Sequence, residues 1–132
     1  MRNSKKLTTT FSYGPGTFRI SHKILEVLGN PKYIVLLVNL DENKVSYTSS
    51  DRSDRSSLHI VYTDYVKKTG KVFNSTRFVR KLFHHYKWNI NSRYQIRGVF
   101  HEKYKIVEFD LNEAYVADRE ICLDNFEINR VD

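Results

Sequence analysis

"GTFRISHKILEVLGNPKY", residues 16–33, places a glycine before a short apolar run and a serine before apolar residues at helical spacing. Residues 70–82, "GKVFNSTRFVRKL", repeat this order at an offset of 54. The pairs that align at that offset include Gly16 with Gly70, Phe18 with Val72, and Ser21 with Ser75. Lys23 with Arg77, Ile24 with Phe78, Leu25 with Val79 and Leu28 with Leu82 align as well. Two helices both need an apolar face, but that need does not explain why each serine follows a glycine by five residues. The match predicts two copies of one unit.

Each copy is typical of a strand, a helix, a strand, a tight turn and a further strand. The serines are candidate N-caps, because a serine oxygen can accept a hydrogen bond from the first helical turn. The first helix is about two turns long and ends at Gly29, before Pro31. The second runs from about Ser75 to Lys87. With "NPKY" (30–33) matching "NSRY" (91–94), the copies span about 16–48 and 70–110.

The expected fold is therefore α+β: a β-rich small barrel or sandwich built from two βαββ-like repeats with two short helices. One domain over residues 1–132 accommodates both copies. Apolar residues make up 40% of the chain and aromatic residues 14%, which argues against disorder and for a real core. Tyr86 and Trp88 are expected in that core.

The remaining segments are less regular. Residues 1–10 are expected to be a loose end, and residues 49–57, "SSDRSDRSS", a polar loop. "LHIVYT", residues 58–63, predicts one more strand. "EAYVADREICLDNFEI", residues 113–128, fits either a short helix or an edge strand.

Several classes of protein are disfavoured. No apolar run is long enough to cross a bilayer, and no apolar stretch follows the basic N-terminus as in a signal peptide. Cys122 is the only cysteine, which excludes an internal disulfide and favours a cytoplasmic setting. The five histidines lack metal-ligand spacing, and no nucleophile or phosphate-loop motif is present. We expect no enzyme activity, no cofactor, no metal and no membrane partner.

Charge is unevenly distributed along the chain. Residues 110–132 carry seven acidic and two basic residues, a net charge of −5. Residues 1–109 carry 20 basic and 8 acidic residues, a net charge of +12. A body this basic favours a polyanionic partner, and nucleic acid is the common one inside cells.

Basic side chains in both copies are the candidate contacts. Those on the second helix are expected to share its exposed side, and two arginines four residues apart should share one face of a strand. Arginine can also bind a guanine edge with two hydrogen bonds, so Arg77, Arg80, Arg93 and Arg97 are the candidates for specificity. The alternative is a solvated cationic face. The full set of nucleic-acid-binding candidates is Arg19, Lys23, Arg77, Arg80, Lys81, Lys87, Arg93 and Arg97.

The first copy resembles the AbrB/MazE/SpoVT swapped-hairpin family of DNA-binding domains. The resemblance covers about 35 residues and is carried by Gly16, Phe18, Ile20, the turn at Ser21, then Ile24, Leu28 and Gly29. It implies a barrel of two interlocked βαββ units, here supplied by one chain as a pseudo-dimer. The chain departs from the family at Ser21, where proline is common, and after the helix, where a Gly-Asp turn is common.

The leading expectation is thus a small DNA-binding regulator that contacts duplex DNA, as a monomer or homodimer. RNA is an alternative ligand that charge alone does not separate from DNA. A different class is a protein-interaction module of a mobile genetic element. Such a module would inhibit a host nucleic-acid-processing or defence (anti-CRISPR-like) system, or would act as an antitoxin.

Overall fold

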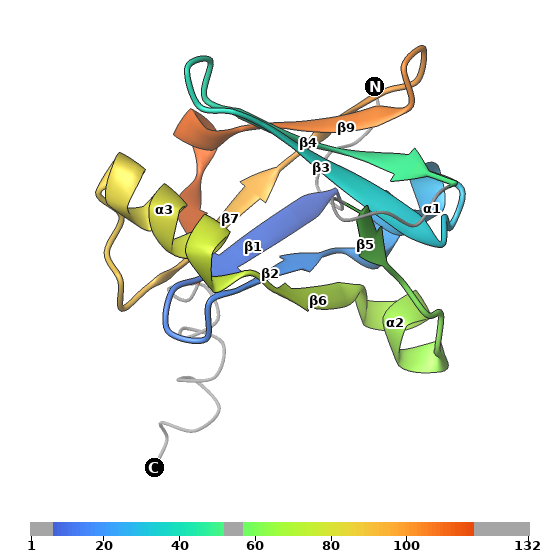
Figure 1. Ribbon diagram of the computed structural model, residues 1–132, viewed down its shortest axis with the longest axis horizontal. Helices are drawn as coiled ribbons and strands as arrows, with labels where there is room; N and C mark the ends of the chain where they lie inside the picture. Colours follow the sequence, from blue (N-terminus) through green and yellow to red (C-terminus); the bar gives the residue numbers. More distant parts are fainter. Residues whose placement is uncertain (1–6, 52–56, 118–132) are drawn as a thin grey trace, which may run out of the picture.

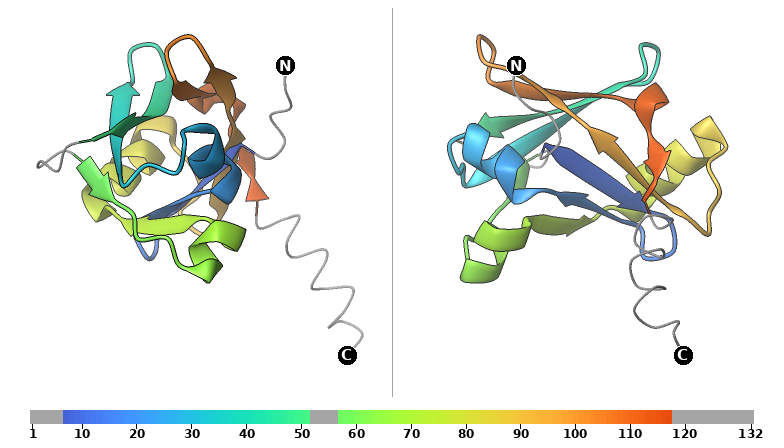
Figure 2. Two further views of the ribbon diagram at one scale, coloured as in Figure 1. Left: turned by 90° about the vertical axis from the view of Figure 1, so that its right-hand side faces the viewer. Right: turned by 180° about the vertical axis from the view of Figure 1, so that it is seen from behind.

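The computed structural model describes residues 7–51 and 57–117 (Figures 1 and 2). Within these ranges, ten strands form two antiparallel sheets, and three short α-helices lie between strands along the chain. The expected α+β, β-rich fold is confirmed. Of the two forms expected, a barrel or a sandwich, the barrel is not formed, because the two sheets do not close on each other. A third helix is present beside the two that were expected.

Each sheet has five strands, which lie side by side in the following order. Sheet A consists of β10 (Tyr115–Val116), β7 (Arg93–Arg97), β1 (Thr8–Ser12), β2 (Thr17–Ile20) and β6 (Lys71–Asn74). Sheet B consists of β5 (Ser57–His59), β3 (Tyr33–Asn39), β4 (Lys44–Ser50), β9 (Ile106–Asp110) and β8 (Val99–His101). The helices are α1 (His22–Val27), α2 (Asp64–Thr69), α3 (Thr76–Tyr86) and the 3₁₀ turn η2 (Leu111–Glu113).

The core lies between the inner faces of the two sheets. The ring of Phe18 in sheet A stacks on the ring of Tyr47 in sheet B, with centroids 6.2 Å apart. The buried hydroxyl groups of Tyr47 and Thr9 are 2.6 Å apart. Because Thr9 donates its proton to the carbonyl oxygen of Arg19, the Tyr47 hydroxyl is the donor to Thr9. This bond satisfies two buried polar groups and joins the sheets.

Gly98 lets one continuous segment pass from sheet A to sheet B. It separates β7, which pairs with β1, from β8, which pairs with β9. A Cβ atom at this position would lie 2.6 Å from the ring of Phe109, which is fully buried. The crossing therefore requires glycine.

The helices begin at the expected serines, but not for the expected reason. Ser21 precedes α1 and Ser75 precedes α3, yet neither side chain accepts a capping hydrogen bond from its helix. Ser21 Oγ instead accepts from the backbone N–H of Thr8, 3.2 Å away, and so ties α1 to β1. Gly29 ends α1 with a positive φ of 87°, as expected.

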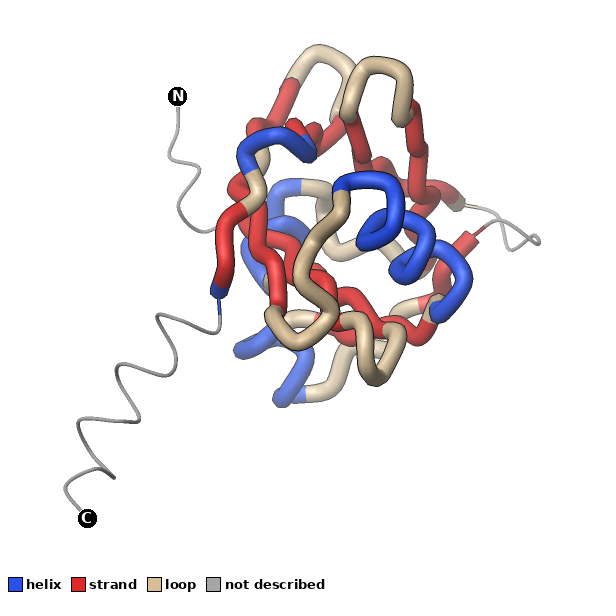
Figure 3. Tube along the Cα trace, turned by 90° about the vertical axis from the view of Figure 1, so that its left-hand side faces the viewer, coloured by secondary structure: helices blue, strands red, loops and turns tan. Residues whose placement is uncertain are grey.

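The apolar face that the sequence predicts for α3 packs onto the core, and Figure 3 looks onto this helix. The ring of Trp88 just beyond α3 stacks on Tyr94, with centroids 4.6 Å apart. Tyr86 and Trp88 both pack against the core.

Three expectations about the irregular segments are corrected. Residues 8–10, expected in a loose N-terminal end, belong to β1, which starts at Thr8, and residues 1–6 lie outside the described ranges. The strand expected over residues 58–63 ends at His59, and helix α2 follows. Ser49, Ser50 and Ser57, expected in a polar loop, belong instead to β4 and β5, and residues 52–56 lie outside the described ranges. Of the two forms expected for residues 113–128, the edge strand is seen: after η2, β10 forms one edge of sheet A. Residues 118–132, with most of the acidic charge of the C-terminal segment, also lie outside the described ranges.

The two segments proposed as copies contact each other reciprocally. Gly16 and Gly70 both have positive φ, and each lies against the start of the helix in the other copy. A Cβ on Gly16 would collide with Thr76, the first residue of α3, and a Cβ on Gly70 would collide with the backbone at His22, the first residue of α1.

The strands that follow these glycines match less well. β2 and β6 pair in antiparallel register, and Phe18 lies opposite Phe73. Phe18 is 1% exposed whereas Val72, its sequence-aligned counterpart, is 48% exposed. The buried residue that corresponds to Phe18 is therefore Phe73, one residue after the aligned Val72.

Candidate functional site on the outer face of sheet A

Side chains alternate between the two faces along the strands of sheet A, and most of the polar ones lie on its outer face. In β1, Thr9 and Phe11 are buried in the core, so Thr8, Thr10 and Ser12 point to the opposite side. The register then defines two neighbouring rows across β7, β1 and β2. One row is Gln95, Thr10 and Arg19; the next is Arg93, Ser12 and Thr17. We call these six residues, with Thr8 and Arg97, the polar sheet face.

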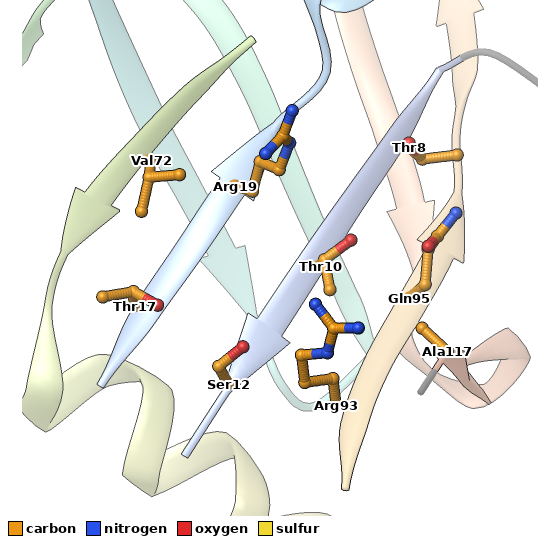
Figure 4. Close-up of a pocket in the computed structure, with 9 residues that line it drawn as sticks. All are labelled: Thr8, Thr10, Ser12, Thr17, Arg19, Val72, Arg93, Gln95 and Ala117. Atoms are coloured by element: carbon orange, nitrogen blue, oxygen red, sulfur yellow. The ribbon is translucent and has the colours of Figure 1, made fainter. Parts of the chain in front are cut away.

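A hollow of about 370 Å³ lies on this face (Figure 4). Its lining combines hydroxyl, guanidinium and amide groups with two small apolar side chains. None of the lining residues is acidic: they are Thr8, Thr10, Ser12, Thr17, Arg19, Val72, Arg93, Gln95 and Ala117. The hollow therefore offers hydrogen-bond donors and positive charge.

Arg19 and Arg93 lie at opposite corners of the two rows. They are two strands and two residues apart, which places their Cα atoms about 12 Å from each other. The guanidinium group of Arg19 donates to the carbonyl oxygen of Thr69, the last residue of α2. Positive charge is favoured at a helix C-terminus, so this contact holds Arg19 at the α2 side of the hollow.

Arg97 extends the positive charge to the edge of the sheet. It shares its face of β7 with Arg93, as the alternation predicted. Its guanidinium carbon lies 5.3 Å from the ring centre of Tyr115 in β10. This cation–π contact orients an exposed side chain.

Two other candidates have structural contacts. Lys23 forms an exposed ion pair with Glu26 at 3.1 Å. Arg80 donates from Nε to the carbonyl of Tyr13 and from Nη2 to that of Gly14, and its guanidinium lies 4.7 Å from the Tyr13 ring. Arg80 therefore fastens α3 to the β1–β2 turn rather than pointing freely from the helix.

The remaining candidates, Arg77, Lys81 and Lys87, are exposed and do not reach the polar sheet face. Arg77 and Lys81, one turn apart on α3, border a second hollow with an apolar floor between α3 and the β3–β4 turn. Among the described residues, neither has a hydrogen-bond or ion-pair partner. The sequence predicts all four α3 cations on one exposed surface; the structure separates Arg80 from the rest.

The hydroxyl-bearing residues that β1 contributes to the site were not predicted from the sequence. Thr8, Thr10 and Ser12 belong to a stretch whose start was expected to be loose. The pattern "TTTFS", with Phe11 as its apolar position, was the available signal for a strand with one polar face.

No metal centre competes with this site in the described ranges. There, no three His, Cys, Asp or Glu side chains gather closely enough to hold a metal ion. Burial raises the pKa of Tyr62 to about 12, and burial also raises the pKa of Tyr47. Both phenols thus stay protonated at neutral pH, as structural donors.

Comparisons of the chain with protein-family models, with curated protein sequences and with solved structures give no match. In the portion that the structure describes, no helix is both long and apolar enough to cross a membrane. Fold and site thus define a small α+β protein with a cationic, hydroxyl-rich sheet face.

Proposed function

We propose that this protein binds nucleic acid through the polar sheet face, with duplex DNA as its ligand, and acts as a transcriptional regulator. One observation carries the proposal: three arginines from two strands share a face on which none of the described strand residues is acidic. Arg, Thr, Ser and Gln side chains are among the groups that contact phosphate and sugar oxygens in protein–DNA complexes. The net charge of +12 over residues 1–109 adds long-range attraction for a polyanion.

We further propose a pseudo-dimeric architecture like that implied by the AbrB resemblance. The reciprocal contacts of Gly16 and Gly70 support it, because each copy's glycine lies under the other copy's helix. Strand pairing supports it as well. β1, which precedes the first copy, pairs with β7 of the second, and β5, which precedes the second copy, pairs with β3 of the first.

Fluorescence anisotropy with a labelled 20-bp random duplex, and with the matching RNA duplex, tests the function. We expect micromolar or tighter DNA binding at 50 mM salt. If three phosphates are neutralised, the affinity falls about 40-fold between 50 and 200 mM salt. Arg93→Gln weakens binding, whereas Lys103→Gln, which removes one charge from the exposed β8–β9 turn, serves as the matched control.

Two results would reject parts of this proposal. No binding to either duplex at 50 mM salt rejects nucleic acid as the ligand. Binding to RNA alone rejects the assignment to duplex DNA, and with it the transcriptional role.

A specific observation favours a second candidate, the inhibitor of a nucleic-acid-processing protein. Arg77 and Lys81 are like charges one helical turn apart, which repel each other unless a partner compensates them. They flank exposed apolar surface that includes Val38, 44% exposed. A protein partner with carboxylates and apolar side chains would satisfy both features. Loss of a copurified partner on Lys81→Glu, with Lys103→Glu as control, distinguishes this function from DNA binding.

A further inference from the structure

The lining of the sheet A hollow restricts what kind of ligand it can hold. Seven of its nine residues carry hydrogen-bond donors, and the other two are Val72 and Ala117. Each guanidinium has five donors and no acceptor, and each hydroxyl can donate one proton. Such a lining fits an anion rich in oxygen acceptors.

Among the residues that the structure describes, no free aromatic ring is available at this face for a base to stack on. None of the residues that line the hollow is aromatic. The nearest ring in the sheet register, Tyr115 opposite Gln95, already lies beneath the Arg97 guanidinium. Trp88 and Tyr94 stack on one another beside the core. Sites that hold exposed bases use free aromatic faces, so the hollow is built for a different part of the nucleic acid.

The arrangement of the arginines indicates contacts with more than one phosphate. Arg19 is held toward the end of α2 by Thr69, whereas Arg93 lies at the opposite corner, about 12 Å away between Cα atoms. Thr10 and Ser12 lie between them on β1 (Figure 4). A nucleic-acid strand that crosses the hollow from one arginine to the other would keep its phosphates over these hydroxyl groups.

We propose that the hollow binds the phosphodiester backbone of one nucleic-acid strand, with the bases turned away from the sheet; this rests on the proposed function. Binding at the polar sheet face is then independent of base sequence. Arg93, which the sequence favours as a base reader, instead positions the backbone. Any reading of base sequence comes from another surface of the protein.

Four 20-bp duplexes of unrelated sequence, AT-rich, GC-rich, alternating and random, test this with three variants. Arg93→Gln weakens binding to all four by about the same factor, roughly tenfold, and reduces the salt slope by about 1. Arg93→Lys stays within about threefold of wild type, because a phosphate accepts a point charge whereas a guanine edge needs the planar fork. Ser12→Ala combined with Thr17→Val weakens all four duplexes equally, with an unchanged salt slope. The fluorescence of Trp88 and the urea midpoint confirm that each variant is folded.

Several outcomes would overturn the inference while leaving the proposed function standing. One is a loss on Arg93→Gln that differs more than tenfold between duplexes. Another is an Arg93→Lys protein as weak as Arg93→Gln, and a third is unchanged affinity in every hollow variant. Release of DNA by 10 mM inorganic phosphate, beyond the effect of chloride at equal ionic strength, would assign the hollow to a free phosphate ion instead. If the wild type binds no duplex at all, the proposed function itself fails.

Discussion

Substitution of Gly70 by alanine tests the reciprocal contact between the two halves of the chain. Gly70 has φ +95° and ψ −172°, a conformation essentially restricted to glycine. A Cβ at this position would lie 2.9 Å from the backbone nitrogen of His22 and would collide with the carbonyl oxygen of Ile20. These are backbone atoms of the β2–α1 connection, so no side-chain rotation relieves the collision.

The expected cost has two parts. Holding a non-glycine residue in this conformation costs about 1–3 kcal/mol. Overpacking against a fixed neighbour costs about 1–3 kcal/mol more. We therefore expect Gly70→Ala to lower the free energy of unfolding by about 2–6 kcal/mol, a large share of the stability of a typical domain.

Urea denaturation followed by the fluorescence of Trp88, the single tryptophan, measures this loss. Gly29→Ala is the matched control, because Gly29 also has a positive φ, +87°, but has no atom within 4 Å of its Cβ position. We expect it to cost only about 1–2 kcal/mol. With a slope of about 2 kcal/mol per molar urea, Gly70→Ala should unfold roughly 1 M before Gly29→Ala. Equal midpoints for the two variants would refute the steric argument.

Three further changes test other contacts. Tyr47→Phe removes the donor to Thr9 and should cost about 1 kcal/mol in urea denaturation; no loss would contradict a stabilising bond between the sheets. The pKa of Tyr62 is raised from 10 to about 12, so stability is full below pH 10 and falls as the pH rises toward 12. Tyr62→Phe should reduce that fall, measured as the urea midpoint from pH 9 to 11.5, and an identical fall would count against it. Arg80→Ala should lower the free energy of unfolding by about 1–2 kcal/mol, because its hydrogen bonds to the β1–β2 turn are lost. Lys81→Ala should lower it by less than about 0.5 kcal/mol. Similar losses in the two variants would contradict a structural role for Arg80.

The regular part of the fold could be predicted because local pattern and tertiary packing agree there. Apolar residues at helical spacing predict α3, and the structure has a helix there. Gly29 predicts the end of α1, and α1 ends just before it. α2 was missed because "LHIVYT" suggests a strand that continues, although Thr63 caps a helix by accepting from the N–H of Val66. The start of α2 is signalled by Thr63 and Asp64, and its end by Gly70. Because the helix has only six residues, these signals were outweighed by the β-branched residues of the segment, which favour a strand.

The candidate site could be predicted only in part, because its residues meet through strand pairing. Arg93 and Arg97 share a strand, so alternation alone placed them together. Arg19 joins them only because β1 inserts between β2 and β7, and nothing local predicts that partner. The role of Arg80 depends on the backbone carbonyls of a distant turn, which carry no sequence signal at all.

The pairing of β1 with β7 has a consequence for synthesis of the chain. β1 starts at Thr8, yet the residue opposite it in β7 is Arg97, near the end of the described chain. At about 5–20 residues per second, that partner is made on the order of ten seconds after β1. During this interval one edge of β1 has no partner, and the two halves cannot fold one after the other as separate units. Such non-local topology also slows folding once the chain is complete. Until β7 has been synthesised, the threonine side chains thus keep the unpaired β1 strand polar.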